Sequence, residues 1–221
     1  MINVNRLDVE IPFDGFSLEG YLNLPPDIKG VVVFAHGSGS SRKSVRNQFI
    51  SNVLNAKNFG TLLFDLLTPE EDLEYENRFD IPLLSERLKG ATEWVKQQEG
   101  CKGLPIGLFG ASTGAAAAII VAAEMGKKIS AVVSRGGRPD MAMNYLERLE
   151  SPILLIVGER DYDVLELNRM AFERIKAEKE LAIVSNATHL FEEPGALEEV
   201  GRLAVAWFEK YLKAHNPSVV L

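Results

Sequence analysis

The segment GASTG, residues 110–114, places one serine between two glycines, where an apolar run gives way to a helix-forming stretch. This is the G-x-S-x-G pattern in the strand–turn–helix setting that its chemistry requires. At so sharp a turn the glycines leave space that a Cβ would fill, and Ser112 is held clear with its hydroxyl exposed. The start of the following helix favours negative charge that develops there. The pattern therefore predicts Ser112 as a catalytic nucleophile.

A serine hydroxyl becomes a nucleophile when a neighbouring base removes its proton, and histidine is the most frequent base. The chain has three histidines, His36, His189 and His215. His189 lies in NATHLFEEPG, directly after the last predicted strand, where it can reach the sheet edge that carries Ser112. His215 lies beyond the last predicted helix and is expected at the surface. His189 is therefore the predicted base.

An imidazole base needs a carboxylate that fixes its tautomer and its orientation. The segment VGERDYDV supplies Asp161 and Asp163 after another predicted strand. We favour Asp161, because Asp163 is better placed to cap the helix that follows. The chain order of Ser112, Asp161 and His189 is one of the orders known for serine catalytic triads.

The elements that position these residues alternate along the chain, which is typical of a mostly parallel sheet covered by helices on both faces. We predict strands at Leu7–Pro12, Phe16–Leu24, Val31–Ala35, Thr61–Phe64, Ile106–Phe109, Ala131–Ser134, Ile153–Val157 and Leu181–Val184. We predict helices at Ser44–Lys57, Ile81–Gln98, Thr113–Met125, Val164–Lys176 and Leu197–Lys213. The first two strands are expected to pair antiparallel around Asp14-Gly15. The acidic stretch Leu66–Asp80 is predicted to be a loop.

The stretch VVVFAHGSGSSRKS, residues 31–44, fits two different chemistries. It is similar to a phosphate-binding loop, since Lys43 and Ser44 match the lysine and hydroxyl of that pattern, and Asp65 imitates its second acidic position. Arg42, however, stands where the pattern requires glycine, and a side chain there obstructs the phosphate. The phosphate hypothesis also leaves the serine, aspartate and histidine unexplained. We therefore favour an oxyanion-binding loop.

Four segments, HGSG, GASTG, VGERDYDV and ATHLFEEPG, occur in order at strand ends, and together they resemble the α/β-hydrolases, close to the dienelactone hydrolase-like group. The resemblance covers nearly the whole chain. It implies an α/β-hydrolase fold, with about eight strands in a mostly parallel sheet and helices on both faces. In that family the acid falls three residues after the glycine that ends its strand, which leads from Gly158 to Asp161. The short connection between Ala131–Ser134 and Ile153–Val157 leaves no room for a large lid domain, so a shallow or open pocket is expected.

The runs SRGGRPD and THLFEEPGALEEV resemble a subgroup of small hydrolases that are sometimes fused to phosphoribosyltransferase domains. No second domain is visible in this sequence, so we expect a single domain over residues 1–221. Dienelactone hydrolase itself uses a cysteine nucleophile, whereas this chain has Ser112 in that place, and Cys101 precedes the strand. The dienelactone substrate therefore does not carry over, and a general ester or thioester substrate does.

The resemblance assigns the oxyanion hole to the backbone amides of Ser38 and Thr113, although the sequence alone also allows Gly37. One such donor contributes about 3–4 kcal/mol in the transition state. His36 is expected to brace this loop by hydrogen bonding, and not to act as a base. Both His36 and Gly37 are also possible contacts to the substrate.

Two arginines follow the Ala131–Ser134 strand at the expected catalytic edge, Arg135 and Arg138. A guanidinium binds carboxylate and phosphate groups well, so both are possible ligands for an anionic part of the substrate. The alternative is local pairing with Asp140 or Glu147.

The composition limits the classes of partner. The chain of 221 residues has 31 acidic and 24 basic residues and a formal net charge of −7, which disfavours nucleic-acid binding. Its single cysteine excludes a disulfide within the chain and two of the common zinc signatures. We expect no metal or organic cofactor. We see no secretory signal and no apolar run long enough to span a membrane, and we expect a cytoplasmic protein without a membrane partner.

The sequence thus predicts a serine hydrolase of carboxylic esters or thioesters with small or exposed acyl groups. An acyltransferase on the same fold is the first alternative, and a binding module without catalysis is the second. The natural substrate stays open, as does the choice between a monomer and a homodimer.

Overall fold

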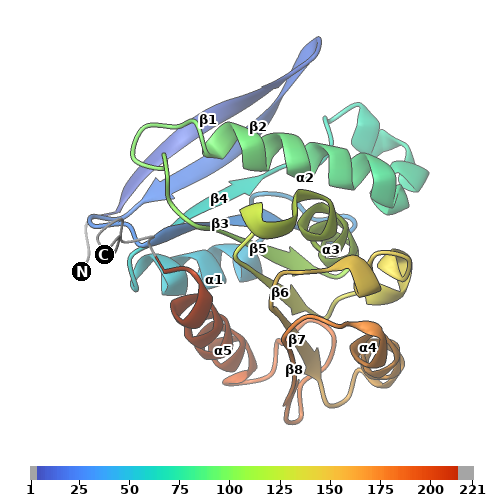
Figure 1. Ribbon diagram of the computed structural model, residues 1–221. Helices are drawn as coiled ribbons and strands as arrows, with labels where there is room; N and C mark the ends of the chain where they lie inside the picture. Colours follow the sequence, from blue (N-terminus) through green and yellow to red (C-terminus); the bar gives the residue numbers. More distant parts are fainter. Residues whose placement is uncertain (1–3, 214–221) are drawn as a thin grey trace.

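A computed structural model describes residues 4–213 of the chain. Its strands form one sheet of eight strands with helices on both faces (Figure 1). The strands are β1 (Asn5–Phe13), β2 (Phe16–Leu24), β3 (Gly30–Ala35), β4 (Phe59–Phe64), β5 (Ile106–Ala111), β6 (Ala131–Arg135), β7 (Ile153–Gly158) and β8 (Lys179–Val184). Their order across the sheet is β1-β2-β4-β3-β5-β6-β7-β8. The sheet is antiparallel from β1 to β4 and parallel from β4 to β8, which confirms the predicted fold class.

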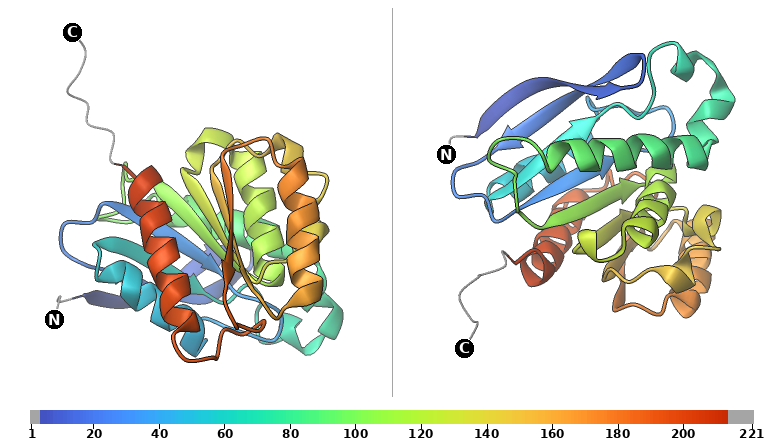
Figure 2. Two further views of the ribbon diagram at one scale, coloured as in Figure 1. Left: turned by 90° about the horizontal axis from the view of Figure 1, so that it is seen from below. Right: turned by 45° about the horizontal axis from the view of Figure 1, so that its top comes forward.

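The helices cover the two faces of the sheet in separate groups (Figure 2). They are α1 (Val45–Asn55), α2 (Ile81–Val95), α3 (Thr113–Met125), α4 (Tyr162–Arg174) and α5 (Ala196–Tyr211). Helices α1 and α5 pack together on one face, while α2, α3 and α4 lie on the other. The result is the three-layer arrangement that buried parallel strands require.

The central strands are buried on both faces, and β3 illustrates how they divide the core. Every residue of β3 is buried. Its side chains alternate, so Val31 and Val33 join the apolar cluster under α2 and α3, whereas Val32 and Phe34 join the cluster under α1 and α5. This explains why β3 appears in the sequence as an unbroken apolar run.

The carboxyl ends of the parallel strands meet at one edge of the sheet, on the right in Figure 1. The turns that follow β3, β5, β6, β7 and β8 therefore lie close together in space. The connection from β6 to β7 contains only two short 3₁₀ helices, Pro139–Ala142 and Leu146–Arg148, and no large lid, as expected. We call this side of the molecule the catalytic edge.

The acidic stretch Leu66–Asp80 differs from its prediction as a loop, because it contains two 3₁₀ helices, Glu71–Leu73 and Tyr75–Phe79. Local capping explains the first of them. The Thr68 hydroxyl accepts the Glu71 amide, and the Glu71 carboxylate accepts the Thr68 amide in return. Such short helices carry no apolar period that a sequence pattern can detect.

Within residues 4–213, no helix has both the length and the apolar character needed to cross a membrane. His215 and the apolar C-terminal residues lie outside the described part of the chain.

Candidate active site

The turn between β5 and α3 holds Ser112 in a backbone conformation that residues with side chains rarely adopt, with φ 52° and ψ −121°. The two flanking glycines make the turn possible. A Cβ on Gly114 would lie 2.2 Å from the Ala35 carbonyl oxygen, and a Cβ on Gly110 would lie 2.4 Å from the Ala115 Cα. Neither position has space for any other residue, so the crowding predicted from the G-x-S-x-G pattern is present.

The Ser112 hydroxyl is left available by this geometry. Ser112 is the N-cap residue of α3, where a serine side chain would ordinarily bond a helix amide, yet its side chain makes no such bond. The hydroxyl stands beside the loop after β3, since a Cβ on Gly37 would lie 3.7 Å from the Ser112 Oγ. The amino end of α3 adds a favourable field for negative charge at this place.

His189 and Asp161 lie together at the catalytic edge, as the sequence predicts. The His189 Nδ1 lies 2.6 Å from the Asp161 Oδ2. The Asp161 side chain is 13% exposed and that of His189 is 37% exposed, so the pair is anchored in protein but open on the imidazole side. A carboxylate at Nδ1 holds the proton on that nitrogen and leaves Nε2 free to act as a base.

The prediction that Asp163 caps the helix after β7 is wrong. The N-cap residue of α4 is Asp161, and Asp163 lies one residue inside the helix, in its first turn. The Asp161 carboxylate makes no bond to the helix amides, because it is turned to His189. Helix α4 begins at Tyr162, two residues earlier than the pattern indicates. Its N-cap residue is therefore Asp161, the aspartate that contacts His189.

The two predicted oxyanion donors come from different elements: Thr113 directly follows Ser112, and Ser38 lies in the loop after β3. Within residues 4–213, the backbone amides of Ser38 and Thr113 donate none of the backbone–backbone hydrogen bonds that occur in turns, loops and helix caps. Thr113 is the first residue of α3, where the amides have no partner inside the helix. Gly37, the alternative donor, lies against the Ser112 side chain, since a Cβ there would be 3.0 Å from the Ser112 Cβ.

His36 is held inside the loop by two hydrogen bonds. The Leu66 amide donates to its Nε2 at 3.0 Å, so the proton is on Nδ1, which donates to the Gly37 carbonyl at 2.9 Å. Burial lowers the pKa of His36, which keeps the ring neutral. These bonds tie the loop after β3 to the end of β4, in agreement with a bracing role.

The two arginines after β6 have different surroundings. The guanidinium of Arg138 binds Asp140 through two hydrogen bonds of 2.7 and 2.8 Å, which is the local pairing considered from the sequence. Arg135 forms no ion pair within residues 4–213, although its residue is only 5% exposed. Its one side-chain acceptor is the Asn47 Oδ1 at 3.4 Å, and its Nε is buried without a partner.

The charge on Arg135 is therefore poorly compensated. Its guanidinium lies 5.7 Å from the centre of the Phe191 ring. Burial, together with the nearby positive charge of Arg46, lowers the pKa of Arg135 to about 10. A buried cation without a carboxylate is uncommon, because desolvation opposes it.

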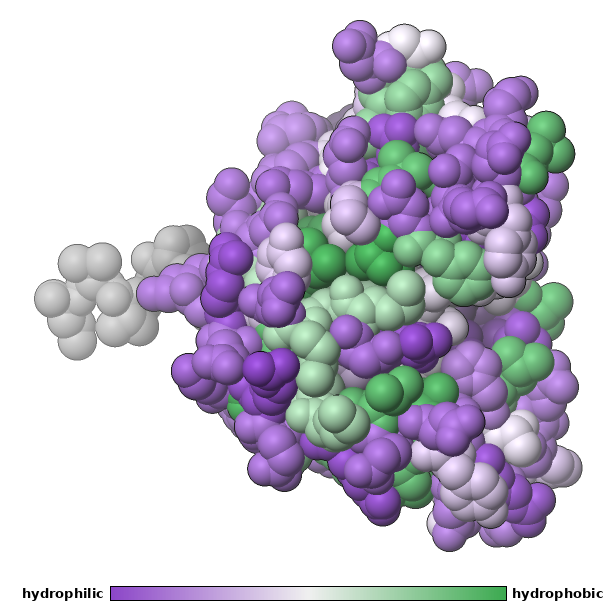
Figure 3. All heavy atoms as spheres, turned by 90° about the vertical axis from the view of Figure 1, so that its right-hand side faces the viewer, coloured by the Kyte–Doolittle hydropathy of each residue, from purple (hydrophilic) through white to green (hydrophobic). Residues whose placement is uncertain are grey.

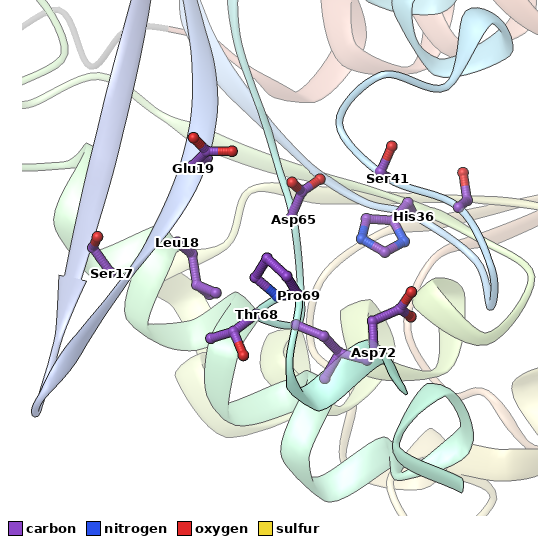
Figure 4. A pocket seen from close by; sticks show the side chains of 11 residues that line it. Ser17, Leu18, Glu19, His36, Ser41, Asp65, Thr68, Pro69 and Asp72 are labelled. Atoms are coloured by element: carbon purple, nitrogen blue, oxygen red, sulfur yellow. The ribbon is translucent and has the colours of Figure 1, made fainter. Parts of the chain in front are cut away.

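A cavity of about 160 Å³ opens beside the loop after β3 (Figure 4). It lies between β2, that loop and the segment after β4, with Leu18, Leu67 and Pro69 as its apolar lining and His36 at its inner end. A smaller pocket shares His36 and Leu67 and continues along the glycines of the loop after β3. Together they form a cleft that runs from Ser38, one of the predicted oxyanion donors, to β2 of the β1–β2 hairpin. The sequence carries no signal for this cleft, because its lining residues come from three separate segments.

Apolar side chains are also exposed at the catalytic edge. Figure 3 looks onto this face and shows a band of apolar residues across its middle, with hydrophilic residues above and below. Exposed apolar residues next to the site include Tyr162, which follows Asp161, and Leu190, which follows His189. An apolar, open mouth suits a substrate that carries an acyl group.

The phosphate-loop alternative finds no support in the geometry. Arg42, at the position that would have to be glycine, hydrogen bonds Asp65 through its side chain, and its backbone amide donates to the same carboxylate at 2.6 Å. Asp65 is thus engaged in fixing the loop. Within residues 4–213, no group of three or more histidine, cysteine, aspartate or glutamate side chains is placed to hold a metal ion.

The fold and the site define a class of protein, and comparison with known proteins agrees with it. The chain belongs to the α/β-hydrolase family, because the model of the alpha/beta hydrolase domain matches residues 28–201. A solved structure of dienelactone hydrolase from Anabaena variabilis is 46% identical, with a TM-score of 0.92 over 95% of this chain and 99% of that one. The fold of Est1E from Butyrivibrio proteoclasticus is similar, with a TM-score of 0.80 at 15% identity over 92% of this chain and 98% of that one.

Two curated relatives come from Mycobacterium tuberculosis, strains CDC 1551 and H37Rv. Each carries the name putative phosphoribosyl transferase and is 50% identical over 211 residues. The match covers 96% of this chain and 48% of each relative, so the chain spans about half their length.

Proposed function

We propose that this chain is a serine hydrolase of carboxylic esters or thioesters, with Ser112 as nucleophile, His189 as base and Asp161 as its orienting acid. The observation that carries the proposal is the combination of a strained, uncapped serine at the β5–α3 turn with a hydrogen-bonded histidine–aspartate pair at the same sheet edge. A strained serine backbone is retained where it has a use, because it costs about 1–3 kcal/mol.

In the proposed reaction, His189 Nε2 takes the Ser112 proton while Oγ attacks the substrate carbonyl. The amides of Ser38 and Thr113 stabilise the oxyanion that forms. His189 then gives its proton to the departing alcohol or thiol, and an acyl-enzyme is left. Water, deprotonated by His189, attacks the acyl group and restores Ser112. Throughout, Asp161 holds the imidazole tautomer and stabilises its protonated form.

The cleft beside the loop after β3 is the proposed site for one side of the substrate. It begins at Ser38, and its apolar lining residues stand among polar and acidic ones, so it suits a small uncharged acyl or alcohol group. The half-exposed His189 leaves the opposite side open to solvent, which suits hydrolysis of exposed esters.

For an anionic part of the substrate we propose Arg135 in preference to Arg138. Asp140 already neutralises Arg138, whereas Arg135 has no carboxylate partner within residues 4–213. A substrate carboxylate or phosphate would supply the missing countercharge. In the variant Arg135→Met, kcat/KM is then expected to fall for esters that carry such an anionic group and to stay unchanged for neutral esters of equal length.

Hydrolysis is the proposed chemistry of this chain, whereas the phosphoribosyl transferase name belongs to relatives of which the chain covers 48%. The test is turnover of a panel of p-nitrophenyl esters and acyl thioesters by the wild type, Ser112→Ala and Ser130→Ala. Ser130 directly precedes β6, at the end of the sheet opposite to the site, so it is the serine control.

We expect turnover by the wild type and by Ser130→Ala, and a loss of about 10³-fold or more in Ser112→Ala. Equal turnover by all three variants would contradict the proposal. Adding an alcohol as a competing acceptor separates the two enzyme classes, because an acyltransferase would yield mainly the new ester and a hydrolase mainly the acid.

A further inference from the structure

The short turn after β6, residues Arg135–Arg138, holds the backbone of the predicted nucleophile from both sides. The Ser112 amide donates to the Arg135 carbonyl at 3.2 Å, and the Arg138 amide donates to the Ser112 carbonyl at 3.1 Å. Ser112 has a strained φ of 52°, so it needs contacts of this kind to persist in its conformation. We call this four-residue segment the β6 turn.

The same β6 turn lies against the predicted base. Gly136 has a φ of +52°, and a Cβ at this position would lie 3.3 Å from the His189 carbonyl oxygen. It would also lie 3.4 Å from Cε1 and from Nδ1 of the imidazole ring. Nδ1 is the atom that meets the Asp161 carboxylate at 2.6 Å. The absent side chain of Gly136 thus leaves the space that the ring occupies while it bonds Asp161.

The β6 turn is also anchored to α4, the helix whose N-cap residue is Asp161. Asn168, fully buried in α4, donates from Nδ2 to the Gly137 carbonyl at 2.9 Å and to the Val164 carbonyl at 2.8 Å. A buried asparagine is costly unless its polar atoms find partners, and within residues 4–213 the Oδ1 of Asn168 has none, so its hydrogen bonds run through Nδ2 alone. Its partner outside the helix is Gly137, so the buried amide joins the helix that follows Asp161 to the β6 turn.

We infer that the β6 turn is the positioning element of the catalytic triad, with Gly136 as the residue that sets the His189 ring and Asn168 as the residue that fixes the turn. The inference rests on the proposed function, because it concerns the alignment of Ser112, His189 and Asp161. Neither Gly136 nor Asn168 is assigned a chemical step. They act through the residues that they hold.

The consequence is a graded steric effect at residue 136. Alanine at this position brings a carbon into tight contact with the His189 carbonyl and ring, which must shift by a few tenths of an ångström. Asparagine, which tolerates a positive φ better than most residues, brings a longer side chain into the same space. A displacement of about 1 Å in a catalytic group costs about 10²-fold in rate.

The experiment compares Gly136→Ala and Gly136→Asn with Gly126→Ala and Gly126→Asn. Gly126 is the matched control, because its φ is +54° and no atom of another residue lies within 4 Å of where its Cβ would be. It ends α3, at the opposite edge of the sheet from the triad. Each variant is measured for kcat and KM on the best ester of the panel, for its rate of labelling by a fluorophosphonate, and for Tm.

We expect kcat to fall about 10-fold in Gly136→Ala and about 10²-fold in Gly136→Asn, with KM changed less than threefold. The labelling rate should fall in parallel, because labelling needs the aligned serine and histidine but no substrate pocket. The Gly126 variants should keep kcat within twofold, even where the alanine or asparagine lowers Tm by a few degrees. This pattern separates positioning from a general loss of stability.

Asn168→Leu provides the second measurement. It keeps the number and branching of the side-chain heavy atoms but leaves the Gly137 carbonyl without its side-chain donor. We expect a fall in kcat of about 10-fold at a temperature well below its Tm, again with little change in KM.

Equal kcat in the Gly136 and Gly126 variants, in an active wild-type background, would overturn the inference while leaving the proposed function intact. A fall in Tm at residue 136 with unchanged kcat in the folded fraction would overturn it as well. An inactive wild type that fluorophosphonates do not label would instead refute the proposed function, so the two failures are distinguishable.

Discussion

Replacing Arg135 by methionine is expected to make the protein more stable. The Arg135 residue is 5% exposed, lacks an ion-pair partner within residues 4–213, and has a buried Nε without an acceptor. Methionine is apolar and flexible enough to fill the space of the arginine stem. A buried charge that is replaced by an apolar residue of similar volume often leaves the fold unchanged or more stable.

The expected gain follows from the pKa of Arg135. Burial and the charge of Arg46 lower this pKa from the ordinary value of arginine to about 10, and each pKa unit corresponds to 1.36 kcal/mol. The charged side chain is thus disfavoured in the folded state by roughly 3 kcal/mol. Methionine loses the contact of the guanidinium with the Phe191 ring and the long bond to Asn47, together about 1–2 kcal/mol. A net gain of about 1–2 kcal/mol remains, which corresponds to a Tm higher by about 3–6 °C.

The pH dependence has a definite sign. Because the folded-state pKa of Arg135 lies below its unfolded-state value, the unfolded chain holds more protons in an alkaline window that begins near pH 10. The free energy of unfolding of the wild type therefore rises as the pH rises through this window. At pH 7 the buried charge of Arg135 destabilises the folded state to its full extent. The difference in free energy of unfolding between Arg135→Met and the wild type should accordingly be constant near neutral pH and shrink above about pH 10.

The assay is urea unfolding of the wild type, Arg135→Met and Arg138→Met at pH 7.5 and pH 10.5. Arg138 is the control, since its guanidinium is paired with Asp140 and partly exposed. We expect Arg138→Met to lose up to about 1 kcal/mol, as is usual for an exposed ion pair. A lower free energy of unfolding for Arg135→Met at pH 7.5 would refute the reasoning, because it would mean that the buried charge is compensated.

Three further predictions concern the site. Asp161→Asn and His189→Ala should each lose about 10⁴-fold in kcat while remaining folded by circular dichroism, and near-normal turnover would remove the residue from the mechanism. Gly114→Ala should lose more than 3 kcal/mol in urea unfolding, because its Cβ would lie 2.2 Å from the carbonyl oxygen that ends β3. Gly103→Ala, whose Cβ would meet nothing within 4 Å, should lose only about 1–2 kcal/mol, the cost of a side chain at its φ of +75°. The pKa of buried His36 is lowered, so the unfolded state takes up a proton at a higher pH than the folded state does. The free energy of unfolding should therefore fall as the pH drops below 6.5. For His36→Gln, the free energy of unfolding should change less between about pH 7 and pH 5.

Much of the fold could be predicted because buried parallel strands leave a strong trace in the sequence. Runs such as Val31–Ala35 are apolar on both faces, and in the structure every residue of β3 is buried. The helix predicted at Thr113–Met125 has the same bounds as α3, since glycine turns delimit it on both sides. The weakly patterned 3₁₀ helices after β4 were beyond such reasoning, because side-chain bonds between Thr68 and Glu71 create the first of them.

The candidate site was predictable where chemistry imposes both a residue type and a place at a strand end. His189 and Asp161 meet at 2.6 Å although 28 residues separate them in the chain. The supporting residues leave no such trace. Asn168 is one asparagine in an amphipathic helix, and only the three-dimensional structure reveals that its amide reaches Gly137. The error over Asp163 has the same origin, since both aspartates suit a helix start and tertiary contacts decide between them.

The most direct test of the proposed function is labelling with a fluorophosphonate probe, followed by mass spectrometry of the labelled peptide, for the wild type, Ser112→Ala and Ser130→Ala. We predict one adduct per chain in the wild type and in Ser130→Ala, located on Ser112, and none in Ser112→Ala. A folded wild type that stays unlabelled, or an adduct on another serine, would contradict the claim that Ser112 is the activated nucleophile.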